Sequence, residues 1–243
     1  MTTDRAARLR ALHVKGSPLI LPNVWDAASA RAVEEAGFPV VATGSSAMAA
    51  VLGYEDGERT PAEEMFAAIA RIVRAVGVPV TADVERGYGL KPAELAGRLA
   101  EAGAVGCNLE DSRDDVLVEP GEQADYLAAV KAAAGDDLVV NARVDTYIVG
   151  DGGIADAMDR GRRYVAAGAD CVYPIGLADP EEIRILAADL PINVYFRPGA
   201  PSHAELAALG VCRVSYGHGL HRAAHVYAES LFAAVAAGRN PYE

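Results

Sequence analysis

The chain has 243 residues, of which 51% are hydrophobic, and a formal net charge of −12. This length and apolar content are enough for one large core, and we expect a single domain over residues 1–243. The negative charge and the lack of a basic patch make nucleic acid an unexpected partner, and no stretch has the length and hydropathy of a membrane span.

The cysteines indicate the compartment. Cys107, Cys171 and Cys212 each lie in an apolar run, as buried free thiols do. An odd number of cysteines fits a reducing cytosol better than secretion, and the charged amino-terminal segment has no apolar signal core. We therefore predict a cytoplasmic protein with no membrane partner.

Apolar runs alternate with helical patterns along the whole chain. After a predicted helix over residues 3–14, the runs with the composition of buried strands cover residues 18–21, 39–42, 79–82, 105–109, 138–142, 171–173, 192–195 and 211–214. The predicted helices that follow them cover residues 27–36, 60–76, 92–102, 121–134, 154–167, 180–188, 202–209 and 219–237. Glycine repeatedly ends a helix just before the next strand, as C-cap glycines do.

Strands that alternate with helices pair in parallel, and eight such units at this length predict a TIM (β/α)8 barrel. The competing architecture is a doubly wound open sheet. That fold usually has fewer strands and carries a glycine-rich phosphate loop after its first strand. Residues 22–26 follow the first strand here and read Pro-Asn-Val-Trp-Asp, so we expect the barrel.

Polar and charged residues gather where the predicted strands end, which is the active-site end of a barrel. They are Trp25, Asp26, Thr43, Gly44, Ser45, Asp83, Glu85, Glu110, Arg143, Asn193 and residues 215–218, with Asp56 in the loop after the second strand. The opposite end shows mainly glycines and helix caps. This asymmetry indicates an enzyme.

Four of these residues are acids, namely Asp56, Asp83, Glu85 and Glu110. An all-oxygen cluster suits Mg²⁺, or Mn²⁺, because these ions bind through a few carboxylates and several waters. Zinc is less suited, because no His or Cys has ligand spacing nearby. The alternative is that some of the acids cap helices or pair with Arg86 and Arg113.

Arg143 has the planar fork that matches the two oxygens of a carboxylate or phosphonate. The structural alternative is an ion pair with Asp145 or Glu110. The backbone N–H groups of residues 43–45 indicate either an oxyanion site or a tight turn.

Two further positions have two interpretations each. Asn193 bonds a substrate oxygen or is a satisfied core amide. Trp25 either lines the pocket or only packs against neighbouring side chains. His218 and His221, at the start of the last helix, are expected to be structural.

Taken together, these residues resemble the isocitrate lyase/phosphoenolpyruvate mutase superfamily over nearly the whole chain. The motifs that carry the resemblance are residues 22–26, 43–45, 52–56 (Leu-Gly-Tyr-Glu-Asp), 83–89 (Asp-Val-Glu-Arg-Gly-Tyr-Gly), 108–112 (Asn-Leu-Glu-Asp-Ser) and 141–145 (Asn-Ala-Arg-Val-Asp). The resemblance implies a Mg²⁺-binding TIM barrel that acts on small oxo, hydroxy or phosphono acids. Such enzymes make or break a C–C or C–P bond next to a pyruvate-like enolate.

The resemblance also implies roles for individual residues. Asp83 would bind the metal directly, and Asp56, Glu85 and Glu110 would hold its waters. The substrate contacts would come from Trp25, Thr43, Gly44, Ser45, Arg143 and Asn193. Catalytic roles would fall to Asp56, Glu110 and Arg143.

The loop after the fourth strand departs from the superfamily pattern. Residues 111–120 read Asp-Ser-Arg-Asp-Asp-Val-Leu-Val-Glu-Pro and lack the Lys-Lys-Cys-Gly-His motif of the lyases and the gate loop of the phosphonomutases. Ile175 stands where the lyases place a Glu. The chain therefore resembles a branch of the superfamily without either loop.

Three functions follow as hypotheses. The first is a Mg²⁺-dependent lyase or decarboxylase on a small 2-oxo acid such as oxaloacetate, since decarboxylation needs an electron sink but no acid/base Cys. The second is C–P chemistry, as a phosphonopyruvate hydrolase or a phosphonomutase. The third is a ligand-binding descendant without catalysis.

The last predicted helix, over residues 219–237, has more apolar residues than a solvent-facing helix needs. We predict that it packs on a neighbouring subunit of a homo-oligomer, a tetramer or dimer in this superfamily, often by exchange of that helix. Packing on its own barrel is the alternative.

Overall fold

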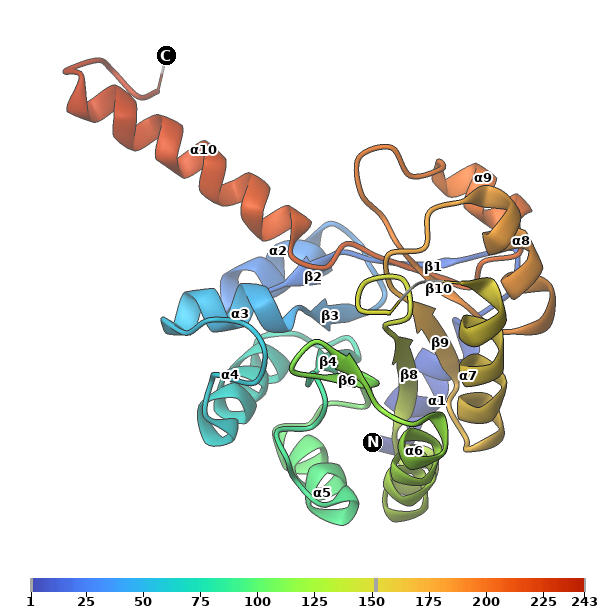
Figure 1. Ribbon diagram of the computed structural model, residues 1–243. Helices are drawn as coiled ribbons and strands as arrows, with labels where there is room; N and C mark the ends of the chain where they lie inside the picture. Colours follow the sequence, from blue (N-terminus) through green and yellow to red (C-terminus); the bar gives the residue numbers. More distant parts are fainter. Residues whose placement is uncertain (1, 151–152, 243) are drawn as a thin grey trace.

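The apolar runs form a ring of parallel strands enclosed by helices in the computed structural model, which describes residues 2–150 and 153–242 (Figure 1). The ring is a (β/α)8 barrel, so the predicted fold class is confirmed. Its strands are β1 (Leu19–Leu21), β2 (Asn23–Val24), β3 (Val41–Thr43), β4 (Val80–Asp83), β5 (Gly106–Leu109), β8 (Val139–Val144), β9 (Cys171–Pro174), β10 (Asn193–Tyr195) and β11 (Arg213–Ser215). The predicted domain limits, residues 1 and 243, lie outside the described residues.

The first barrel strand is interrupted at Pro22, which has no backbone N–H to donate to a neighbour. The part before the proline, β1, pairs with β11, and the part after it, β2, pairs with β3. From β2 the parallel ladder continues through β3, β4, β5 and β8 to β9. A bridge from Val172 to Ile192 then joins β9 to the β10–β11 pair, so the ring closes.

The helices outside the ring are α2 (Ala27–Glu35), α3 (Ser45–Leu52), α4 (Ala62–Ala75), α5 (Pro92–Ala102), α6 (Pro120–Ala134), α7 (Ile154–Ala166), α8 (Pro180–Asp189), α9 (His203–Ala208) and α10 (Gly219–Ala236), with a short 3₁₀ turn at Gly135–Asp137. Most follow the predicted ranges closely. They bury an apolar stripe at helical spacing, as α4 does with Met65, Ile69 and Ile72. Two elements have no predicted counterpart, namely α3 and the antiparallel hairpin of β6 (Ser112–Arg113) and β7 (Val116–Leu117).

Helix α1 (Thr2–Ala11) closes the amino end of the barrel. Leu9 is buried with Leu19, Val105 and other residues at the starts of the strands. Nearby, the guanidinium of Arg10 pairs with Asp170 at 2.6 Å, just before β9 begins. With the amino end plugged, the carboxyl ends of the strands are left to form a binding site.

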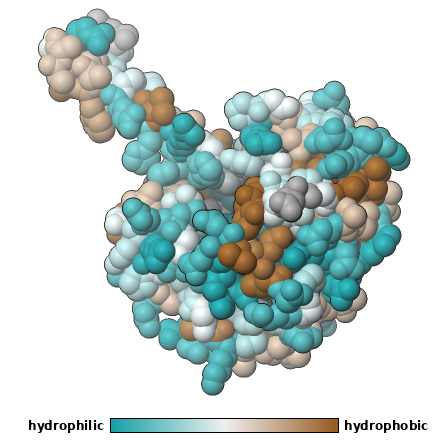
Figure 2. Space-filling view, in the orientation of Figure 1, coloured by the Kyte–Doolittle hydropathy of each residue, from teal (hydrophilic) through white to brown (hydrophobic). Residues whose placement is uncertain are grey.

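Helix α10 projects away from the barrel (Figure 1). Figure 2 shows it standing clear of the body, with polar and apolar surface along its length. Its exposed apolar side chains include Tyr227 and Phe232, which keep 67% and 70% of their surface accessible. Within residues 2–150 and 153–242, no helix combines the length and hydropathy needed to cross a bilayer.

Candidate active site

Asp83 is the last residue of β4 and lies against the start of α3. Its backbone N–H donates to the Thr43 hydroxyl at 2.9 Å. The N–H and hydroxyl of Ser45 both approach Asp83 Oδ2, at 3.4 and 3.2 Å. Burial raises the pKa of the Asp83 carboxyl, while the charge of Arg143 and the Ser45 N–H oppose that rise. The carboxylate is therefore held by the first turn of a helix, whose dipole favours negative charge.

The turn that follows β4 has an unusual backbone. Glu85 and Tyr88 have φ of 51° and 56°, in the left-handed region that residues other than glycine rarely adopt. Gly87 lies between them with φ of 99°, and a Cβ there would meet the Tyr126 hydroxyl at 2.7 Å. Backbone strain of this kind clusters at functional sites. Here it brings the Glu85 N–H within 3.4 Å of Asp83 Oδ1.

Two hydrogen bonds tie the Glu85 carboxylate to its own turn and to the loop before α4. Its Oε1 accepts from the Tyr88 hydroxyl at 2.7 Å, and its Oε2 accepts from the Glu58 N–H at 2.5 Å. The Glu58 carboxylate accepts in turn from the Tyr88 N–H. Burial raises the pKa of Glu85 to about 7, against the lowering effect of the Tyr88 bond. Sequence reasoning missed Glu58 and the Tyr88 hydroxyl.

Asp56 lies on the exposed loop between α3 and α4, two residues before Glu58. Its negative charge is close enough to raise the pKa of both Asp83 and Glu85. The structure therefore brings Asp56 near the two acids of the β4 turn.

Arg143 forms both of the ion pairs named as its structural alternative. On β8, its Nε and Nη2 donate to the two carboxylate oxygens of Asp145 at 2.5 and 2.8 Å. Its Nη1 pairs with Glu110, which follows the neighbouring strand β5. Burial raises the pKa of the Glu110 carboxyl, and the Arg143 charge opposes that rise. One guanidinium thus neutralises an acid from each of two strand ends.

Two of the three backbone N–H groups expected to face an oxyanion, those of Gly44 and Ser45, have other partners. That of Gly44 donates to the Val24 carbonyl at 3.1 Å, and that of Ser45 points to Asp83. In this structure residues 43–45 therefore form a turn between β3 and α3, as in the tight-turn alternative. Gly44 also packs under the last barrel loop, because a Cβ on it would lie 3.5 Å from the Gly217 carbonyl oxygen.

Asn193 and Trp25 lie at different depths. Asn193 is fully buried inside the barrel, where its Nδ2 donates to the Ser215 hydroxyl at 3.0 Å. Its buried Oδ1 has no hydrogen-bond partner among the described residues. Trp25 is half-buried, and its ring meets the His221 ring edge-on with 5.0 Å between centroids. His221 thus packs behind Trp25, which agrees with a structural role.

The acids fit a hard divalent cation by their chemistry, although they are not arranged around one point. Across residues 2–150 and 153–242, no three His, Cys, Asp or Glu side chains stand in a metal-coordinating arrangement. The reason is visible in the contacts, since Glu110 turns to Arg143 and Glu85 turns to Tyr88. Charges of neighbouring acids nevertheless raise the pKa of Asp83, Glu85 and Glu110. A cation with oxygen ligands, such as Mg²⁺ or Mn²⁺, would relieve that repulsion.

Comparison with known proteins places this geometry in a family. The family model described as phosphoenolpyruvate phosphomutase matches residues 9–236. The crystal structure of a Burkholderia cenocepacia J2315 protein described as a phosphonomutase superposes with a TM-score of 0.89 and 42% identity. That similarity covers 94% of this chain and 99% of the other.

Two more relatives bear on chemistry. An oxaloacetate decarboxylase from Ectopseudomonas mendocina (strain ymp) is 31% identical over 83% of this chain and 74% of its own length. A phosphonopyruvate hydrolase, solved in complex with oxalate and Mg²⁺, has a TM-score of 0.83 and 26% identity. That comparison covers 98% of this chain and 89% of the hydrolase.

Proposed function

The chain belongs to the phosphoenolpyruvate phosphomutase family, within the isocitrate lyase/phosphoenolpyruvate mutase superfamily, and from this premise we propose a Mg²⁺-dependent lyase of decarboxylase type. Its substrate would be a small 2-oxo carboxylic acid such as oxaloacetate. The observation that carries the proposal is the group of acids around Asp83, which lies beside Arg143 at the open end of the barrel. That arrangement pairs a cation site with a carboxylate site.

We propose that Asp83 contacts the ion directly and that Asp56, Glu85 and Glu110 hold its water ligands. When bound, Mg²⁺ would supply Lewis acidity to the 2-oxo and carboxylate oxygens and an electron sink for cleavage of the bond to C3. The Ser45 hydroxyl and N–H would keep Asp83 oriented, since both already lie against its Oδ2. The strained Glu85 turn would hold the second acid.

Arg143 is proposed to bind the substrate carboxylate. Asp145 fixes two of its N–H groups, so Nη1, which now pairs with Glu110, is the group that would turn to the ligand. Glu110 would then be released toward the ion. In this proposal Glu110 and Arg143 exchange partners when substrate and cation bind together. Trp25, Thr43, Gly44, Ser45 and Asn193 are proposed to line the substrate site.

Decarboxylation is favoured over C–C cleavage that needs a proton acceptor, because residues 111–120 contain no Cys, His or Lys. Loss of carbon dioxide from a 2-oxo acid requires charge stabilisation on the oxygen atoms and little else from the protein. The similarity to an oxaloacetate decarboxylase supports this choice. Asp56, at the solvent-facing edge, is proposed to assist proton delivery to the product.

C–P chemistry is the second candidate, because two of the similar solved structures are described as a phosphonomutase and a phosphonopyruvate hydrolase. The deciding experiment measures turnover of oxaloacetate and of phosphonopyruvate, each with Mg²⁺ and with EDTA. We expect the protein to release pyruvate from oxaloacetate when Mg²⁺ is present and not when EDTA has removed it. Phosphate from phosphonopyruvate with oxaloacetate untouched would replace the first proposal by the second. Inactivity on both, together with no Mg²⁺ binding by calorimetry, would leave a ligand-binding descendant.

We further propose a cytoplasmic, single-domain homo-oligomer, a dimer or tetramer. The exposed apolar side chains of α10 support assembly, because the helix projects from its own barrel and leaves them uncovered (Figure 1). This counts against the alternative that α10 packs on its own barrel.

A further inference from the structure

The segment after β5 forms a closed hairpin rather than an open loop. Strands β6 and β7 pair with Ser112 opposite Leu117. The turn residues Asp114 and Asp115 have φ of 48° and 59°, which is the backbone of a tight type I′ turn. Below the strands, the Val118 N–H donates to the Asp111 carbonyl at 2.9 Å. Asp111 and Val118 therefore mark the base of the hairpin.

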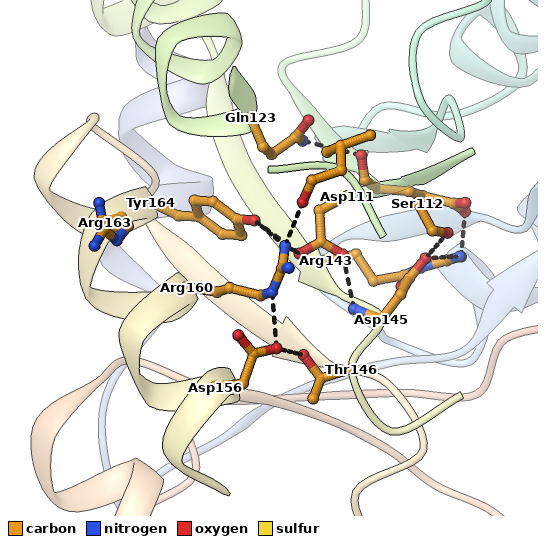
Figure 3. Close-up of polar contacts among 12 residues, drawn as sticks. Asp111, Ser112, Gln123, Arg143, Asp145, Thr146, Asp156, Arg160, Arg163 and Tyr164 are labelled. Atoms are coloured by element: carbon orange, nitrogen blue, oxygen red, sulfur yellow. Dashed lines mark hydrogen bonds and ion pairs between the residues drawn. The ribbon is translucent and has the colours of Figure 1, made fainter. Parts of the chain in front are cut away.

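Two side chains from α7 hold that base, as Figure 3 shows. Nη1 of Arg160 donates to Asp111 Oδ2 at 3.1 Å and to the Val118 carbonyl at 2.9 Å, so it reaches both arms of the hairpin. The Tyr164 hydroxyl donates to the same Asp111 oxygen at 2.7 Å. Asp111 and Tyr164 are 0% exposed and Arg160 is 6% exposed. A buried ion pair that loses one partner leaves an uncompensated charge.

The same carboxylate also reaches the candidate active site. Asp111 Oδ1 accepts from the Asp145 N–H at 2.8 Å. Asp145, fully buried, accepts from Arg143 through both oxygens and from the Ser112 hydroxyl. A continuous set of hydrogen bonds thus runs from α7 through the hairpin base to the guanidinium of Arg143 (Figure 3).

We propose that Arg160 and Tyr164 are positioning residues that fix the hairpin base and, through Asp111 and Asp145, orient Arg143 for the carboxylate of a small 2-oxo acid. The ligand part of this inference rests on the proposed function. The mechanical part does not, because the contacts exist without any ligand. In this arrangement Arg160 touches no substrate and acts only through the residues that it holds.

This hydrogen-bond network fixes the position of the hairpin relative to the candidate active site. With its base tied to α7, the hairpin is held where its Ser112 hydroxyl bonds Asp145, the partner of Arg143. Asp145 orients two N–H groups of the arginine before a ligand binds, so less ordering entropy is lost on binding.

The test compares Arg160→Met and Tyr164→Phe with wild type. Arg163→Met is the matched control, because Arg163 lies on the same helix but pairs at the surface with Asp159. Oxalate binding in the presence of Mg²⁺, measured by calorimetry, reports on Arg143. Hydrogen exchange of the Val118 amide and of the Arg143 Nε–H, measured by NMR, reports on how firmly Arg160 and Tyr164 hold the hairpin base. This measurement needs no ligand.

For Arg160→Met we expect oxalate to bind about 10- to 100-fold more weakly, as after loss of an outer-shell partner in metal sites, and both N–H groups to exchange faster. Tyr164→Phe should show a smaller change in the same direction. On an Arg143→Lys background, Arg160→Met should weaken oxalate binding no further, because Arg160 acts through Arg143. Arg163→Met should leave every measurement unchanged.

Wild-type oxalate affinity in Arg160→Met and Tyr164→Phe would overturn the positioning role, even with faster exchange at Val118. If Arg160→Met does not fold, Tyr164→Phe, which removes one hydroxyl, decides the question. A wild-type protein that does not bind oxalate with Mg²⁺ would contradict the proposed function alone. In that case, slow hydrogen exchange at the Arg143 Nε–H that becomes faster in Tyr164→Phe would still support the positioning role of Arg160 and Tyr164. Exchange that the variant leaves unchanged would refute that role.

Discussion

Ser45 holds Asp83 by two groups at once, its backbone N–H at 3.4 Å and its hydroxyl at 3.2 Å from the same carboxylate oxygen, Oδ2. The other oxygen, Oδ1, accepts from the Glu85 N–H at 3.4 Å. Asp83 is therefore oriented by a helix start on one side and by its own turn on the other. Its position is set before any cation arrives, which lowers the cost of binding one.

The first prediction concerns Asp83 itself. Asp83→Asn keeps the size of the side chain but removes its charge and turns one acceptor oxygen into an N–H donor, so Mg²⁺ affinity should fall by about 100-fold or more. Titration calorimetry with Mg²⁺ measures the effect. Asp159→Asn, which removes a surface acid on α7, is the control and should bind as wild type does. Unchanged affinity in Asp83→Asn would remove Asp83 from the metal site.

Ser45 gives a second, milder prediction. Ser45→Ala removes the hydroxyl bond to Asp83 and keeps the backbone N–H, so Mg²⁺ should bind about 10-fold more weakly. Ser46→Ala is the matched control, since Ser46 is the next residue of α3 and is less buried. Equal effects of the two substitutions would show that the helix start, and not the hydroxyl, governs Asp83.

The Arg143 network makes a prediction about stability. Arg143→Met leaves Asp145 and Glu110 buried without their cation, and loss of one partner from a buried pair costs about 3–5 kcal/mol. Urea unfolding should show this loss. Adding Asp145→Asn to Arg143→Met should recover part of it, because one of the two orphaned charges is then gone. A double variant less stable than Arg143→Met would contradict the account.

Much of the fold follows from local pattern. Short apolar runs ended by glycine or polar residues recur eight times, and this alone predicts the barrel and most helix limits to within a few residues. Two elements were not predicted, because their sequences show no helical or strand periodicity. Helix α3 is built of small residues, Ser-Ser-Ala-Met-Ala-Ala-Val-Leu, which resemble a loop after a strand. The β6–β7 turn uses two aspartates at positive φ, where asparagine and glycine are the usual signal.

Register explains which site residues could be foreseen. Asp83, Glu110 and Arg143 lie at the carboxyl ends of neighbouring parallel strands, so their side chains must meet at one end of the barrel. Contacts that depend on loop shape could not be foreseen, such as the bond from the Glu58 N–H to Glu85. The same holds for Arg160 and Asp111, which are 49 positions apart and meet only through the packing of α7.

His13 predicts an acid limit to stability. Its Nδ1–H donates to the Leu9 carbonyl at 2.9 Å, while Nε2 is buried without a partner among the described residues. Burial, reinforced by the charge of Arg213, lowers the pKa of His13 to about 4. Between the unfolded pKa near 6.5 and this value, only the unfolded chain takes up the proton. Stability must therefore fall as the pH drops from 6.5 to 4.

The measurement is the difference in unfolding free energy between wild type and His13→Gln, by urea titration at several pH values. This difference isolates His13 from the carboxyls that titrate in the same range. Between pH 7 and pH 4, wild type should lose at most about 3 kcal/mol of unfolding free energy relative to His13→Gln. A difference that stays constant with pH would mean that His13 has the same pKa in the folded and the unfolded chain.

The last prediction tests assembly through α10. The helix is about 27 Å long at 1.5 Å per residue, and it carries Val226, Tyr227, Phe232 and Val235 exposed to solvent. An apolar surface of this kind is normally covered by another chain. Light scattering should therefore give a mass above that of one 25.3 kDa chain, and Phe232→Glu with Tyr227→Glu should lower it. Glu229→Gln, on the same helix, should leave the mass unchanged. A wild-type monomer would show that α10 stays uncovered in solution.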